Sequence, residues 1–204
     1  MTIRYDNQVA IVTGAGAGLG RSHALALAAR GAKVVVNDLA AEDGVMSEGS
    51  LAVVAEIEKA GGEAMANGAN VANMQQVQTM VEQAMEKWGR IDILVNNAGI
   101  LRDKSFANMP IEDFKLVVDV HLMGSTNCTK AVWNIMKQQN YGRIVMTTSS
   151  SGLYGNFGQA NYGAAKMAVV GLMNTLCIEG QKNNIQINCL SPTARTAMTE
   201  ELIE

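Results

Sequence analysis

The sequence predicts an α/β fold, a Rossmann-like doubly wound parallel sheet with helices on both faces. Short apolar runs alternate with longer helical stretches, which is typical of parallel strands joined by crossover helices. The first run enters a glycine-rich turn followed by an alanine-rich helix, a layout that binds phosphate groups. With 204 residues, of which 48% are hydrophobic, the chain has the size of one such unit. We therefore expect residues 1–204 to form a single dinucleotide-binding and catalytic domain.

The expected elements follow one another along the chain. Glycine often closes a helix at its C-terminal end, so Gly61 and Gly62 should end the second helix and Gly89 the third. The last long helix should run from Gln159 to about Lys182, and its largely apolar circumference suits burial on two sides. The predicted strands are Val9–Thr13, Lys33–Asn37, Glu63–Asn67, Ile91–Asn96, Gly142–Thr148 and Ile185–Leu190.

The glycine-rich turn from Gly14 to Gly20 predicts a site for a pyrophosphate. Glycines permit positive φ and a close backbone approach, while the helix that opens near Leu19 offers free amide groups and the positive end of its dipole. An ordinary tight turn is the alternative. Asp38 follows the second strand, near the ~20-residue offset at which an acid binds the adenosine ribose. A carboxylate there repels a 2′-phosphate, and no Arg or Lys lies between Gly14 and Gly20, so NAD is predicted over NADP.

Tyr162 and Lys166 are four residues apart and should share one helix face. We expect the ammonium to lower the pKa of the phenol from ~10, which would make Tyr162 a usable base for an alcohol. Ser149 ends the fifth strand thirteen residues earlier. Ser150 and Ser151 are competing hydroxyls. A tyrosine and a lysine at this spacing also arise by chance, so the pair needs the glycine turn as independent support.

Together these features resemble the short-chain dehydrogenase/reductase family over essentially the whole chain. The motifs are Thr13-Gly14-(three residues)-Gly18-Leu19-Gly20, Asn96-Asn97-Ala98-Gly99 after the fourth strand, and Ser149 with Tyr162 and Lys166. The resemblance implies that Tyr162 takes the alcohol proton, Ser149 holds the oxygen, and Lys166 also orients the nicotinamide ribose. The cofactor-binding residues it implies are Gly14, Gly18, Leu19, Gly20, Asp38, Asn70, Val71, Asn96, Ala98, Gly99, Tyr162, Lys166 and Thr196.

Two departures from the family pattern are visible. His121 stands where most members carry an asparagine, and Asn70-Val71 stands where many place an Asp-Val pair beside the adenine. With His121, the segments 99–106 and 154–162 resemble the D-3-hydroxyacyl-CoA dehydrogenase branch, found in peroxisomal multifunctional enzymes of fatty-acid β-oxidation and in bacterial relatives. For His121, a structural role that bridges buried backbone groups and a proton relay both stay open. Which atoms of Asn70 meet the base also stays open.

The branch implies an NAD-dependent oxidoreductase that oxidises a secondary alcohol, in the first place a D-3-hydroxyacyl-CoA, to the ketone. A β-ketoacyl carrier-protein reductase of the same fold is an alternative, although Asp38 argues against the NADPH it would use. A second alternative is a cofactor-sensing module without catalysis. A third alternative is a fragment that serves only as a subunit interface. The expected partner is an acyl-CoA or another secondary alcohol, and the family's use of the last long helix between subunits implies a homodimer or homotetramer.

Composition excludes other classes of function. The net charge of -3 without a basic run argues against nucleic acid. The sequence shows no apolar signal region and no stretch of ~18 apolar residues, which argues against a membrane and favours the cytoplasm, or the peroxisome in a eukaryote. Cys128, Cys177 and Cys189 are odd in number and widely spaced, so we expect free thiols and no metal site. The family pattern continues with a covering helix and a seventh strand, so we expect the chain to be incomplete after Glu204, with the final strand missing.

Overall fold

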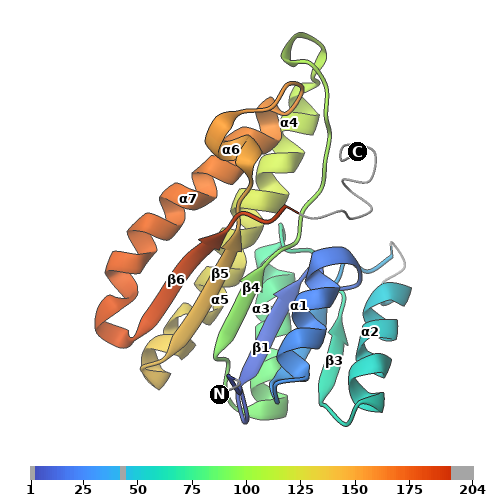
Figure 1. Cartoon of the computed structure of the whole chain (residues 1–204), viewed down its shortest axis with the longest axis vertical. Coiled ribbons are helices and arrows are strands. Elements are labelled where there is room, and N and C mark those ends of the chain that lie inside the picture. Colours follow the sequence, from blue (N-terminus) through green and yellow to red (C-terminus); the bar gives the residue numbers. More distant parts are fainter. Residues whose placement is uncertain (1–2, 42–44, 194–204) are drawn as a thin grey trace.

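The computed structural model describes residues 3–41 and 45–193 of the chain. Its centre is a six-stranded sheet with the order β3-β2-β1-β4-β5-β6, in which every neighbouring pair is parallel (Figure 1). The order reverses between β1 and β4, which is where a doubly wound sheet leaves room for a ligand at its carboxyl edge. The strands are β1 Val9–Thr13, β2 Lys33–Asn37, β3 Ala64–Asn67, β4 Ile93–Asn96, β5 Gly142–Thr147 and β6 Ile185–Leu190.

The six predicted strands are confirmed, with ends that move by one or two residues. At the start of β4, for example, the side chain of Gln139 replaces a neighbouring strand as the partner of Ile91. Its Oε1 accepts from the Ile91 N–H at 3.0 Å and its Nε2 donates to the Ile91 carbonyl at 2.6 Å. A side chain from a distant helix satisfies this backbone, so the ladder begins later than hydropathy predicts.

Seven α-helices connect and cover the strands in the described residues. Gly61 at φ 85° follows α2 and Gly89 at φ 73° follows α3, as predicted. The side chains of Ser47 and Asn73 cap the starts of the same two helices. None of the helices in residues 3–41 and 45–193 is both long and apolar enough to cross a bilayer. The helices are α1 Gly18–Ala28, α2 Glu48–Lys59, α3 Met74–Trp88, α4 Ile111–Val118, α5 Gly124–Gln139, α6 Ser150–Tyr154 and α7 Ala160–Gly180, with short turns η1 Phe106–Asn108, η2 Asp119–Met123 and η3 Gln181–Asn183.

The two ends of the sheet are covered differently. The residues of β1 are buried on both faces, because α1 and α2 lie on one face while α3, α5 and α7 lie on the other (Figure 1). In β5 and β6 buried and more exposed residues mostly alternate. The described residues therefore cover only the α7 face of these two strands. The prediction of a parallel sheet with helices on both faces is confirmed, with α1 and α2 on one face and α3, α5 and α7 on the other.

A π-helical turn interrupts the long helical run between β4 and β5. The run passes from α4 through η2, which is the π-helical segment Asp119–Met123, into α5. Such turns are rare and occur frequently at functional sites. This one carries His121, which is buried.

Candidate active site

The glycine turn after β1 leaves no room for side chains at two positions. Gly14 has φ 61°, and a Cβ added there would stand 2.8 Å from Cα of Ala98. A Cβ on Gly20 would overlap the Gly14 carbonyl oxygen and stand 2.6 Å from Nδ2 of Asn97. The turn, the start of α1 and the loop after β4 are therefore in backbone contact, at the point where the strand order reverses.

Asn97 fixes this contact with hydrogen bonds. Its Nδ2 donates to the carbonyls of Thr13 at 2.9 Å and Gly14 at 3.0 Å. In return, Oγ1 of Thr13 accepts from the N–H groups of Asn97 and Ala98, both at 3.0 Å. Sequence reasoning placed Asn97 in the Asn96-Asn97-Ala98-Gly99 motif, for which the family implies steadying of the sheet, but did not name it among the cofactor-binding residues. The doubled asparagine was the available signal, because only one of two successive side chains can face the turn.

Asn96 is the first residue of the Asn96-Asn97 pair and was predicted to bind the cofactor. Its side chain is buried, and Nδ2 donates to Oγ1 of Thr129 on α5 at 3.1 Å. Asn96 thus supports the helix layer, while Asn97, Ala98 and Gly99 form the loop beside the turn.

The start of α1 fits a phosphate group. Ala17 precedes the helix and has no side-chain group to cap it, and the first turn carries no acidic residue. The amide groups there and the positive dipole end can therefore serve an anion. Gly18 has φ 54°, and Leu19 behind it is half-buried. Asp38 lies against this turn, since a Cβ on Gly16 would overlap its carboxylate. These residues fit a dinucleotide with its ribose at Asp38.

The loop after β3 forms the next part of the cleft. Oδ1 of Asn70 accepts from the Ala72 N–H at 2.9 Å, and the Val71 carbonyl accepts from Nδ2 of Asn127 at 3.0 Å. A hollow of about 590 Å³ opens beside this loop and includes Leu39 and Asn70 in its lining. Such a space suits a flat base. Thr196, the remaining predicted cofactor contact, lies outside the described residues.

The structure brings Ser149, Tyr162 and Lys166 together at the carboxyl end of β5. Ser149 caps α6, with its Oγ accepting from the Ser151 N–H at 3.2 Å, and its hydroxyl also hydrogen-bonds the phenol of Tyr162. Lys166 is 4% exposed, and its Nζ donates to the Thr147 carbonyl at 2.7 Å. The same Nζ stands 5.5 Å from the ring centroid of Tyr162. Of the competing hydroxyls, Ser150 is exposed and Ser151 is half-buried.

The prediction that Lys166 lowers the pKa of Tyr162 is wrong for this structure. Burial raises the pKa of Tyr162; the hydrogen bond from Ser149 lowers it, and the charge of Asp103 raises it. Burial also lowers the pKa of Lys166 to about 8. Its ammonium is held by a backbone carbonyl and is itself destabilised, so it gives the phenolate little support. Tyr162 therefore keeps its proton at neutral pH in this structure.

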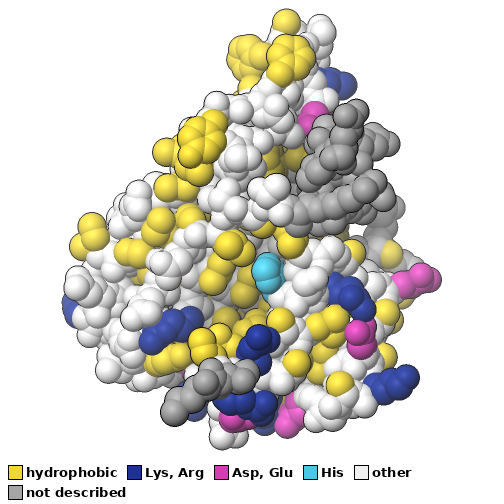
Figure 2. Space-filling model, in the orientation of Figure 1, with side chains coloured by type: hydrophobic (Ala, Val, Ile, Leu, Met, Phe, Trp, Pro, Cys, Tyr) yellow, Lys and Arg dark blue, Asp and Glu magenta, His cyan; other side chains and the backbone are white. Residues whose placement is uncertain are grey.

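The rim above these residues is apolar. Phe106, Tyr154 and Phe157 are 76%, 86% and 90% exposed, and hydrophobic side chains gather at this end of the molecule (Figure 2). The two segments that carry them are joined, since the Lys104 N–H donates to the Gly158 carbonyl at 2.9 Å. The rim is thus a connected surface that suits a substrate with an apolar part.

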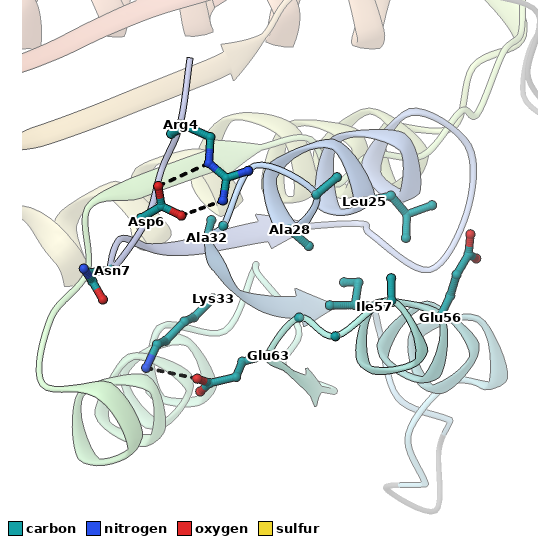
Figure 3. A pocket seen from close by; sticks show the side chains of 15 residues that line it. Arg4, Asp6, Asn7, Leu25, Ala28, Ala32, Lys33, Glu56, Ile57 and Glu63 are labelled. Atoms are coloured by element: carbon teal, nitrogen blue, oxygen red, sulfur yellow. Dashed lines mark hydrogen bonds and ion pairs between the residues drawn. The ribbon is translucent and has the colours of Figure 1, made fainter. Parts of the chain in front are cut away.

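A second hollow, of about 570 Å³, lies at the opposite edge of the sheet, between α1, α2 and the N-terminal segment (Figure 3). Four of its charged groups pair with one another, Arg4 with Asp6 at 2.7 Å and Lys33 with Glu63 at 3.3 Å, and Glu56 pairs with Arg21 outside the lining. No predicted site residue lines it. In the described residues no group of three or more His, Cys, Asp or Glu side chains is placed to hold a metal ion.

A family model described as short chain dehydrogenase matches residues 8–204. The chain belongs to the short-chain dehydrogenase family. Membership explains the convergence of the glycine turn with Ser149, Tyr162 and Lys166, and it implies a nicotinamide dinucleotide cofactor.

Relatives within the short-chain dehydrogenase family are similar over almost the whole chain. Peroxisomal multifunctional enzyme type 2 of Drosophila melanogaster is 55% identical over 98% of this chain, which covers 34% of that protein. A 3-oxoacyl-[acyl-carrier-protein] reductase of Synechocystis is 47% identical over 96% of this chain and 77% of its own length. A crystal structure of a short chain dehydrogenase from Mycobacterium avium superposes with a TM-score of 0.89 at 43% identity, covering 95% of this chain and 70% of that one. The chain thus spans about a third of the length of the Drosophila relative.

Proposed function

We propose that the protein oxidises the 3-hydroxyl of a D-3-hydroxyacyl-CoA to the 3-keto group with NAD. The observation that carries this proposal is the meeting of Ser149, Tyr162 and Lys166 at the carboxyl edge of the sheet, the edge that also holds the glycine turn after β1. This arrangement occurs in a chain similar to peroxisomal multifunctional enzymes. The apolar rim around Phe106 and Phe157 supports a substrate with an acyl chain.

In this proposal each residue of the chain has a task. Bound NAD would supply the hydride acceptor and the positive charge of its nicotinamide ring. Tyr162 would take the proton of the hydroxyl through its phenolic oxygen, which requires its raised pKa to fall first in the assembled site. The Ser149 hydroxyl would hydrogen-bond the substrate oxygen as its bonding changes. Lys166 would hold the ribose and add its charge near the ring.

The preference for NAD over NADP rests on Asp38. Its carboxylate lies against Gly16 at the ribose end of the turn, where it would repel a 2′-phosphate. We expect Asp38→Asn to raise kcat/KM with NADP relative to NAD by about tenfold, since one repulsive charge of about 1.4 kcal/mol is removed. Parallel assays with both cofactors test this, and an unchanged ratio would contradict the assignment to NAD.

Reduction of a β-ketoacyl carrier-protein substrate is the second candidate, favoured by the similarity to the Synechocystis reductase. It would use the same residues in the opposite direction. Rates on acetoacetyl-CoA with NADH and with NADPH separate the two candidates, because the reductase should prefer NADPH and the proposed dehydrogenase NADH.

The deciding experiment follows NADH formation with D- and L-3-hydroxyacyl-CoA of several chain lengths. We expect turnover of the D series only, because the branch that the sequence resembles acts on D-3-hydroxyacyl-CoA. The L series is the matched control. Turnover of simple sugars or steroids, with no turnover of either acyl-CoA series, would remove the acyl-CoA assignment and leave the dehydrogenase assignment intact.

We also infer a homodimer or homotetramer. The exposed apolar residues Met167 and Ile178 of α7 and Leu116 of α4 support a covered face there, because these two helices pack on each other. Light scattering of the wild-type protein and of Ile178→Glu tests this, and a monomeric wild type would contradict it. The peroxisomal names of several relatives support a peroxisomal location in a eukaryotic source.

A further inference from the structure

The π-helical turn Asp119–Met123 places a buried histidine in the wall of the candidate active site. His121 is 2% exposed. Its ring meets the ring of Tyr162 edge to face, with centroids 5.1 Å apart and planes at 89°. This is a favoured geometry for two aromatic rings, so His121 helps to set the direction of the phenol.

The other side of the imidazole is attached to the loop after β4. Nε2 lies 2.8 Å from the Ile100 carbonyl oxygen and 3.1 Å from the Ile100 nitrogen. The ring also fills the space where Gly99 lacks a side chain, since a Cβ there would overlap Cε1 of His121. His121 therefore connects the cofactor loop at Gly99 and Ile100 to Tyr162 on α7.

The remaining ring nitrogen is the informative atom. Nδ1 of His121 is buried and makes no hydrogen bond to any described residue. The shorter contact assigns the ring proton to Nε2, which donates to the Ile100 carbonyl and leaves Nδ1 as an acceptor. A phenylalanine would fill the same space without a buried acceptor. The histidine is thus better explained by its hydrogen bonding than by its volume.

Burial, more than any neighbouring charge, keeps the ring neutral. Burial, followed by the charge of Lys166, lowers the pKa of His121 to about 3, against a smaller opposing effect of the Ile100 backbone. Tyr162 and Lys166 face it from α7, and the Ile100 backbone faces it from the loop after β4. The ring proton on Nε2 is directed at the Ile100 carbonyl rather than at Tyr162, so the geometry points to positioning as the contribution of His121.

We propose that His121 is a positioning residue: a neutral imidazole that fixes the Tyr162 ring against the Gly99–Ile100 backbone and offers one acceptor to the assembled site. This inference rests on the proposed alcohol oxidation at Tyr162. Sequence reasoning left two roles open for His121, a proton relay and the bridging of buried backbone groups. The proposal assigns it the second role.

Three variants separate hydrogen bonding from volume. His121→Phe keeps the ring and its contact with Tyr162 but loses the bond to Ile100, His121→Gln keeps a hydrogen-bonding group, and His121→Ala removes both. Val132→Ala, in the buried core of α5, is the control for general destabilisation. For each, kcat, KM and the affinity for NADH by fluorescence are measured on the alcohol that the wild type oxidises best.

We expect His121→Phe to lower kcat by about 10- to 100-fold, as a misplaced reactive group does, with KM and NADH affinity changed far less. His121→Gln should recover part of the loss, and Val132→Ala should lower only the melting temperature. If His121→Phe has the kcat of the wild type, or if Val132→Ala loses kcat in the same proportion, the proposal is overturned.

An activity-independent measurement keeps the two proposals distinguishable. The phenol of Tyr162 is titrated by ultraviolet difference absorbance, with Tyr162→Phe subtracted. Removal of the His121 ring in His121→Ala should admit water and move the pKa of Tyr162 down toward its ordinary ~10, while Val132→Ala should leave it unchanged. An unchanged pKa in His121→Ala would refute the positioning role even if the protein oxidised no alcohol at all.

Discussion

The two halves of the sheet differ in the kinds of polar side chain that they bury. In the half formed by β1, β2 and β3, neutral side chains are paired with backbone. Asn37 is an example, since its Nδ2 donates to Oδ1 of Asn67 at 3.1 Å and to the Ala69 carbonyl at 3.0 Å. The half formed by β4, β5 and β6 also buries ionisable side chains, with the pKa of Lys166 lowered to about 8 and that of His121 to about 3.

Buried atoms without a hydrogen-bond partner follow the same contrast with one exception. In the described residues Asn96 Oδ1, His121 Nδ1, Thr147 Oγ1 and Asn183 Oδ1 belong to the half that carries the proposed catalytic groups, here called the catalytic half, whereas Gln8 Oε1 precedes β1 in the other half. A satisfied, neutral network is rigid, which suits recognition of a cofactor whose shape does not change. Unpaired buried groups destabilise the fold, and they persist where chemistry uses them. The comparison predicts that substitutions in the first half weaken binding and folding, whereas those in the second half weaken turnover.

The largest effect is expected from Tyr162→Phe. Without the phenol no group is placed to take the alcohol proton, so kcat should fall by about 10²- to 10⁴-fold. NADH affinity and the melting temperature should change little, because the ring and its contact with His121 remain. Steady-state rates together with NADH fluorescence measure both. A variant that keeps more than a tenth of the wild-type kcat would show that the catalytic half does not work through this residue.

Sequence reasoning reached the strands, the glycine turn and the grouping of Ser149, Tyr162 and Lys166 because each leaves a local signal. Six apolar runs bounded by turn residues define β1 to β6, and the spacing of four residues alone places Tyr162 and Lys166 on one face of α7. The C-terminal ends of α2 and α3 were also predictable, since Gly61 and Gly89 take positive φ there.

Features that depend on three dimensions were not predictable in this way. Lys166 is four residues from Tyr162, but whether it lowers the pKa of the phenol depends on burial. It also depends on the Thr147 carbonyl, to which the ammonium of Lys166 donates a hydrogen bond. The different uses of Asn96 and Asn97 depend on which side chain faces the turn. The π-helical turn at His121 has no periodicity that hydropathy reveals, because it shifts the register by a single residue.

Lys166→Met should sharpen the contrast on the catalytic side. The pKa of Lys166 falls from 10.5 in the unfolded chain to about 8 in the folded one. The unfolded chain therefore binds more protons between these values, and wild-type stability rises with pH across this window. The shift corresponds to about 3 kcal/mol that burial costs at pH 7, offset by about 1 kcal/mol for the bond to Thr147.

We therefore expect Lys166→Met to unfold at higher urea concentration than the wild type at pH 7, by about 2 kcal/mol, while kcat is strongly reduced. The difference in stability should shrink and then disappear between pH 8 and pH 10.5. Urea titrations at several pH values measure it. A wild type that is the more stable protein at pH 7 would contradict the view that the catalytic half keeps its charge at the expense of stability.

Asn97 follows β4, but its side chain holds the glycine turn after β1, so Asn97→Ala tests the opposite side of the comparison. It has the smallest expected effect on turnover. It removes the two bonds to the Thr13 and Gly14 carbonyls, which should lower the free energy of unfolding by about 1–3 kcal/mol and weaken NADH binding because the glycine turn loosens. The exposed Asn188 of β6 provides the control, as Asn188→Ala should change neither quantity. Once saturated with cofactor, Asn97→Ala should keep a kcat near that of the wild type, because the phenol of Tyr162 and its neighbours are untouched. A loss of kcat at saturation, with NADH affinity intact, would mean that the two halves are not separable and that Asn97 belongs with the catalytic groups.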